Sequence, residues 1–181
     1  LSSPLPKIKK NTKSFSLSDG AYEFKFISCK KNILKGMSLQ SFTLSTKKGL
    51  NIPLSIYNNL LQEKKYVSFL KKIKKFNFDC VGLSFIQNSK IINLLRKQHP
   101  NKLFISKIEN YLGYINRKEI IENSDAIMID RGDLSAEVGV SQLSEYVENI
   151  MIDAKKFGKP VIIATENLNS LIEANTPSKS D

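Results

Sequence analysis

The chain has 181 residues, of which 41% are hydrophobic and 25% charged, and its formal net charge is +11. This composition fits one folded domain or part of a larger one, and no apolar run reaches the roughly 18 residues that a membrane span needs. Two cysteines and one histidine exclude a disulfide scaffold and a histidine-rich metal site, and they argue against a Ser-His-Asp hydrolase. We therefore expect a cytoplasmic protein that does not enter a membrane.

The positive charge is concentrated in residues 1–75, which hold 16 lysines and only three acidic residues. A basic surface of this kind can attract nucleic acid or a phosphorylated substrate. Nucleic-acid interfaces favour arginine, whose planar fork matches phosphate and guanine, whereas this chain has 25 lysines and three arginines. We interpret the lysines as solvated faces and do not expect nucleic-acid binding.

The first 75 residues predict a short β region followed by a helix. Apolar and polar residues alternate over 22–28 and 39–45, which predicts two half-buried strands joined through residues 32–36. Residues 58–75 predict a helix with lysines outside an apolar stripe made of Leu60, Leu61, Val67, Leu70 and Ile73. Such a helix either lies on a membrane surface or forms the outer layer of an α/β fold, and we favour the second interpretation.

From residue 80 onward the sequence alternates between strand and helix patterns. Buried parallel strands are predicted by four apolar runs, at 80–86, 103–108, 126–130 and 160–165. Helices are predicted between them at 89–98, 116–123 and 141–157. The alternation indicates a parallel α/β architecture, either a barrel or an open sheet.

Polar side chains follow each predicted strand, where barrels and doubly wound sheets bind their ligands. They include Ser84, Lys107 with Glu109, Asp130 with Asp133, and Thr165. Residues two apart on a strand point the same way, so Lys107 and Glu109 either form a structural salt bridge or share a site. Asp133 either caps a following turn or joins Glu109 in offering the hard oxygen ligands that Mg²⁺ prefers.

Several long motifs in the chain resemble pyruvate kinase. They are KIENYLGYINRKEIIENSDAIMIDRGDLSAEVG at 107–139, GKPVIIATENLNSLI at 158–172, GLNIPLS at 49–55, VGLSFI at 81–86 and the tail NTPSKSD at 175–181. The resemblance implies a (β/α)8 TIM barrel of the phosphoenolpyruvate/pyruvate superfamily. A complete barrel takes about 250 residues, so we expect a partial one here, without the family's first two strands, its eighth strand and its C-terminal domain.

The resemblance also implies a division of the chain into three parts. Residues 1–10 would form the region of the third barrel strand, residues 11–46 a shortened β lid insert, and residues 47–181 the βα units of the barrel.

Position by position, the resemblance implies a role for five residues. Lys107 matches the lysine that stabilises the enolate of pyruvate, and Glu109 and Asp133 match the carboxylates that bind Mg²⁺ or Mn²⁺. The backbone amides of Gly132 and Asp133 match those that hold the substrate carboxylate. Thr165 matches the threonine beside the methyl carbon.

The chain departs from the family pattern at four positions near the expected site. Ser2 and Ser3 stand where the family has the Asp and Thr of its potassium site, which makes potassium dependence doubtful. Asp130 replaces an Ala and Glu166 replaces a Gln, and both replacements add negative charge that would repel an anionic substrate unless it is compensated.

The resemblance implies Mg²⁺-dependent phosphoryl transfer between phosphoenolpyruvate and ADP, giving pyruvate and ATP, by a homo-oligomeric enzyme. Two alternatives stay open. One is a Mg²⁺-dependent lyase or aldolase that handles the pyruvate enolate without nucleotide. The other is a catalytically inactive binding module, since fold alone does not fix function.

Overall fold

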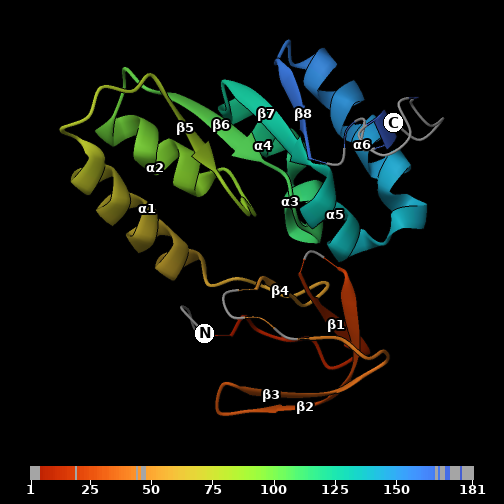
Figure 1. Cartoon of the computed structure of the whole chain (residues 1–181). Helices are drawn as coiled ribbons and strands as arrows, with labels where there is room; N and C mark the ends of the chain where they lie inside the picture. The colour runs from red at the N-terminus through yellow and green to blue at the C-terminus, as the bar shows by residue number, and fades with distance from the viewer. Residues whose placement is uncertain are drawn as a thin grey trace.

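The fold combines a parallel sheet covered by helices with a small antiparallel sheet (Figure 1). The computed structural model describes residues 5–18, 20–43, 45, 48–165, 167, 170–171 and 176. Ser2, Ser3, Glu166 and most of the tail 175–181, all singled out in the sequence, lie outside the described residues. The parallel α/β architecture expected from the sequence is confirmed.

The parallel sheet has four strands in the order β5-β6-β7-β8, and every neighbouring pair runs parallel. The strands are β5 (Cys80–Leu83), β6 (Leu103–Lys107), β7 (Ala126–Asp130) and β8 (Val161–Ala164). Each lies within one of the four apolar runs. Because the strands are parallel, their carboxyl ends meet at one edge of the sheet.

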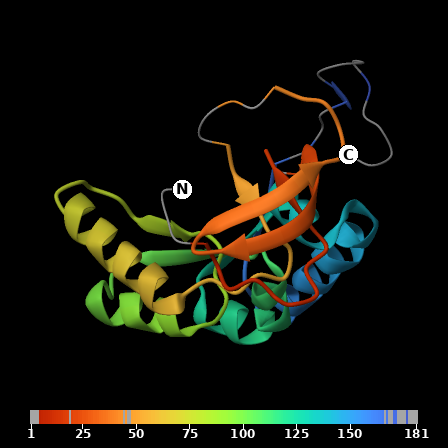
Figure 2. The same ribbon diagram turned by 90° about the horizontal axis from the view of Figure 1, so that it is seen from below.

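Helices cover one side of this sheet. They are α1 (Asn59–Ile73), α2 (Lys90–Gln98), α4 (Arg117–Asn123) and α6 (Val140–Lys156). Figure 2 shows them along one side of the sheet, running from yellow to blue. Alternate strand residues point into the core that the helices close, and these are fully or almost fully buried: Val81, Leu83, Phe104, Ile127 and Ile129.

Helix α1 is an outer helix of this layer. Leu70 is fully buried, and Val67 and Ile73 pack against the core. The predicted apolar stripe is wrong at its first turn, because Leu60 and Leu61 are 67% and 40% exposed. Among the described helices, none is both long enough and apolar enough to cross a membrane.

Two further short helices follow directly after strands β6 and β7, and the sequence analysis did not predict them. They are α3 (Tyr111–Ile115) and α5 (Arg131–Val138). Their N-cap residues, Asn110 and Asp130, accept hydrogen bonds from the amides three residues later. With five and eight residues, they are too short to show an apolar periodicity.

The small sheet has the order β3-β2-β1-β4 and is antiparallel throughout. Its strands are β1 (Ser14–Leu17), β2 (Tyr22–Lys30), β3 (Ile33–Ser38) and β4 (Leu50–Asn51). The strand predicted at 22–28 lies inside β2.

The prediction of a strand at 39–45 is wrong, because the described residues of that range, 39–43 and 45, form no strand. The strand that follows β2 in the chain and pairs with it is β3, which includes most of the expected connection 32–36. The cause is a two-residue turn, in which Lys31 and Asn32 take positive φ angles of 48° and 62°. Such a turn suits the twist of a hairpin and brings the chain back at once.

The small sheet and its flanking loop lie toward the carboxyl ends of the parallel strands, at the bottom of Figure 1. Glu137 of α5 joins the two parts, since its Oε1 accepts the amide of Leu54 at 2.9 Å and that of Tyr111 at 3.2 Å. Lys7 and Ile56 form an isolated antiparallel bridge nearby. The division of the chain at residues 10 and 46 stays a prediction.

Burial raises the pKa of Glu137, and the hydrogen bonds from Tyr111 and Leu54 only partly oppose this effect. The folded chain therefore holds this proton more tightly than the unfolded chain, so stability falls as the pH rises above the ordinary value of 4.5. Glu137→Gln keeps Oε1 and cannot ionise. We expect its melting temperature, measured relative to the wild type by circular dichroism, to rise between pH 4 and pH 8.

The control is Glu122→Gln, which removes an exposed carboxylate from α4. Its difference from the wild type should not vary with pH in this way. If the melting temperature of Glu137→Gln instead falls relative to the wild type as the pH rises, the buried carboxylate is stabilising in its ionised form.

Candidate functional site

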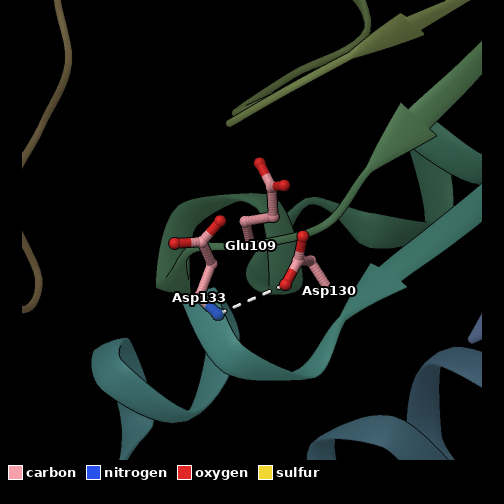
Figure 3. Close-up of side chains that lie close together, drawn as sticks. All are labelled: Glu109, Asp130 and Asp133. Atoms are coloured by element: carbon pink, nitrogen blue, oxygen red, sulfur yellow. Dashed lines mark hydrogen bonds between the residues drawn. The ribbon is translucent and has the colours of Figure 1, made fainter. Parts of the chain in front are cut away.

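Three carboxylates converge at the carboxyl edge of the parallel sheet (Figure 3). Asp130 is the last residue of β7, Asp133 lies in the first turn of α5, and Glu109 comes two residues after β6. One oxygen of each carboxylate lies within 4.8 Å of the other two. Glu109 and Asp133, which the sequence analysis paired, are thus brought together.

Lys107 completes the cluster with its ammonium group. Its Nζ lies 2.6 Å from Oε1 of Glu109 and 3.2 Å from Oδ2 of Asp130. Lys107 and Asp130 point to the same side of the sheet, because Lys107 pairs with Met128 and Asp130 follows two residues later. The salt bridge that the sequence left open as an alternative is therefore present, and it lies inside the candidate site.

Lys107 and Glu109 place a positive charge beside a buried carboxylate. Burial alone would lower the pKa of Lys107, but hydrogen bonds and charges from Glu109 and Asp130 outweigh it and raise the pKa. Burial also raises the pKa of Glu109, whose side chain is fully buried. The Lys107 ammonium and the Phe85 amide, which donates to Oε2 at 2.6 Å, oppose that rise.

Asp130, rather than Asp133, caps helix α5. Its Oδ1 accepts the amide of Asp133 at 3.4 Å, the usual contact from an N-cap residue to the third helical residue. The interpretation of Asp133 as the cap is therefore wrong. The spacing Asp-Arg-Gly-Asp carries this signal, although Asp130 was expected only as a polar residue at the strand end and as an added negative charge.

Thr165 and Gly132 lie next to this cap. Oγ1 of Thr165 donates to Oδ1 of Asp130 at 2.7 Å and accepts the amide of Gly132 at 3.0 Å. Thr165 has a φ angle of 60°, which is unusual for a β-branched residue and is typical of functional or otherwise constrained positions. All five residues selected from the sequence thus belong to one cluster.

The cluster suits a small divalent cation. Three carboxylates face one ammonium group, so the cluster carries an excess of negative charge that a cation would neutralise. Its ligand atoms are hard oxygens, which Mg²⁺ and Mn²⁺ prefer. Glu109 and Asp133 are the residues that would hold such an ion, and the carboxylate of Asp130 lies beside them.

Comparison with known proteins identifies the family of the chain. The family model "Pyruvate kinase, barrel domain" matches residues 5–181. The chain belongs to the pyruvate kinase family. A pyruvate kinase of Trypanoplasma borreli is 30% identical over 166 residues, covering 91% of this chain and 33% of the relative. A probable cytosolic pyruvate kinase of Arabidopsis thaliana is 31% identical over 172 residues, covering 91% and 34%.

Solved structures give the same result. The crystal structure of a pyruvate kinase from Cryptosporidium parvum superimposes with a TM-score of 0.78 at 29% identity, covering 97% of this chain and 38% of that one. The chain spans about a third of the length of these relatives. Its fold is a partial α/β barrel of the pyruvate kinase type with a small antiparallel sheet.

We expect Glu109→Gln and Asp133→Asn each to weaken Mn²⁺ binding about tenfold or more, because each removes one anionic oxygen ligand and one charge. Free Mn²⁺, followed by electron paramagnetic resonance during a titration, measures the dissociation constant directly. Glu122→Gln removes the same charge from an exposed position on α4 and should leave it unchanged. Equal Mn²⁺ affinity in all three variants would place the metal elsewhere.

Proposed function

We propose that this chain carries the phosphoenolpyruvate and pyruvate site of a Mg²⁺-dependent phosphotransferase that forms pyruvate and ATP from phosphoenolpyruvate and ADP. The observation that carries the proposal is the position of the Lys107 ammonium, 2.6 Å from Glu109 and beside the three carboxylates at the sheet edge. This combination joins a cation-binding site to a fixed positive charge, and phosphoryl transfer depends on both.

Each residue of the cluster has a task in this reaction. Lys107 neutralises the charge on the enolate oxygen as it develops, and its raised pKa keeps it protonated. The amides of Gly132 and Asp133, at the N-terminal end of α5, hold the substrate carboxylate. Thr165 lies beside the methyl carbon. A Mg²⁺ ion held by Glu109 and Asp133 would supply Lewis-acid stabilisation of the substrate oxygens.

In the structure, the amides of Gly132 and Asp133 already donate hydrogen bonds to side chains of the protein. The amide of Gly132 donates to Thr165, and that of Asp133 donates to Asp130. Binding of a carboxylate therefore requires that these short-range bonds be exchanged for bonds to the substrate.

For the second substrate we propose ADP. A Cryptosporidium parvum pyruvate kinase in complex with ADP resembles this chain, with a TM-score of 0.77 at 28% identity. We assign residues 11–46 to a short lid over this end of the site, since the small sheet lies toward the carboxyl ends of the parallel strands. A lid of this kind excludes water during transfer.

We further propose a cytoplasmic homo-oligomer. A relative at 31% identity is named as a cytosolic isozyme, and a sequence with only two cysteines, Cys29 and Cys80, has too few for a disulfide scaffold. Phosphoenolpyruvate, pyruvate and the adenine nucleotides are the expected partners. Potassium dependence is not part of the proposal, because Ser2 replaces the family's carboxylate.

The test follows the exchange of the methyl protons of pyruvate in D₂O by NMR, with Mg²⁺ and the full chain. Lys107→Met should slow exchange about 100-fold or more, because the enolate loses its fixed counter-charge. Lys118→Met, which removes an exposed lysine of α4, should leave the rate unchanged.

Adding ATP separates the remaining functions. Exchange that depends on both Lys107 and ATP supports the kinase, whereas exchange that ignores nucleotide supports a lyase or aldolase acting on the enolate. If the folded wild-type chain catalyses no exchange under either condition, the enzyme proposal is wrong and a binding module remains.

A further inference from the structure

Asp130 occupies the groups that the proposed function reserves for the substrate. Its Oδ2 lies 3.2 Å from Nζ of Lys107, and its Oδ1 accepts the hydroxyl of Thr165 at 2.7 Å and the amide of Asp133 at 3.4 Å. An ammonium, a hydroxyl and a helix N-terminal amide are the donors that a carboxylate ligand would use. A protein carboxylate thus already binds all three.

Asp130 also acts on the second amide of α5 indirectly. Thr165 uses its proton on Asp130, so its oxygen is turned to accept the amide of Gly132 at 3.0 Å. One side chain therefore satisfies Asp133 directly and Gly132 through Thr165. An incoming carboxylate has to displace both bonds before it reaches the helix.

The negative charge of Asp130 also disfavours an anionic ligand. With Asp130, one ammonium faces three carboxylates, so a bound divalent cation brings the total only to zero. Without Asp130, the same ion would leave one positive charge for an anionic ligand. The aspartate removes the surplus charge that would attract a carboxylate or an enolate.

The fold does not need this charge. The role of Asp130 in the fold is to cap α5, and asparagine caps a helix as well as aspartate does. Its ion pair with Lys107 is not needed to anchor that lysine, which already contacts Glu109 at 2.6 Å. The negative charge of Asp130 can therefore be removed without removing the cap, and we expect its removal to affect ligand binding.

We propose that Asp130 is a specificity-determining residue, an internal competitor that weakens the binding of carboxylate ligands to the metal-loaded site. The inference rests on the proposed function, since it takes the amides of Gly132 and Asp133 and the ammonium of Lys107 as the carboxylate donors.

The experiment measures oxalate binding to the full chain by isothermal titration calorimetry at saturating Mn²⁺. Asp130→Asn keeps the cap and removes the charge, and we expect it to bind oxalate at least about tenfold more tightly than the wild type. Asp130→Ala, which also frees Thr165 and the amides, should bind at least as tightly as Asp130→Asn. Glu122→Gln removes a distant charge and should match the wild type.

Oxamide, the neutral analogue of oxalate, separates charge from general changes in the site. Asp130→Asn should leave oxamide binding within about twofold of the wild type, because no anion has to be accommodated. If both analogues gained equally, the site would have loosened without regard to charge, and the inference would be wrong.

The failures of the two proposals differ. If the wild type binds oxalate and Asp130→Asn binds it no more tightly, the inference is wrong while the proposed function stands. If Mn²⁺ binds but oxalate binds to neither the wild type nor any Asp130 variant, the proposed substrate site is wrong, and the inference is wrong with it.

Discussion

The buried ion pair between Lys107 and Glu109 is the contact on which the carboxyl edge of the sheet depends. Glu109 is fully buried and also accepts the amide of Phe85, just after β5. Lys107 reaches Asp130 at the end of β7, and Asp130 reaches Thr165 just after β8. One continuous set of polar contacts therefore runs across the ends of all four parallel strands.

Such a network contributes little to stability by itself, because the desolvation of buried charges offsets most of their attraction. Its value lies in geometry. Lys107, Glu109 and Asp130 each contact at least two partners, so these charges are in place before a ligand arrives. The left-handed conformations of Phe85 and Thr165, at φ angles of 54° and 60°, are kept by the same contacts, because both residues bond directly to the network.

The parts of the fold that depend on burial could be predicted from the sequence, and the parts that depend on a local turn could not. The four parallel strands could be predicted because each is an apolar run, and in β5, β6 and β7 the inward-facing side chains of that run are buried. The hairpin β2–β3 was missed because the left-handed turn at Lys31 and Asn32 carries no glycine, the residue that usually marks it. Helices α3 and α5 were missed because five and eight residues are too few to show an apolar periodicity, although each has an N-cap residue.

The site shows the same limit at the level of single residues. Lys107, Glu109, Asp133 and Thr165 could be selected from their places at the strand ends, because parallel strands bring their carboxyl ends together. Gly132 was selected only through the resemblance to pyruvate kinase. The contacts of Asp130 could not be predicted, since they depend on the register that sets β7 between β6 and β8. Relatives at about 30% identity establish the family, but they do not show how the carboxylate of Asp130 changes the charge beside Lys107. The family relationship therefore accounts for the scaffold, while in our proposal the strength with which this chain holds an anion depends on the single side chain of Asp130.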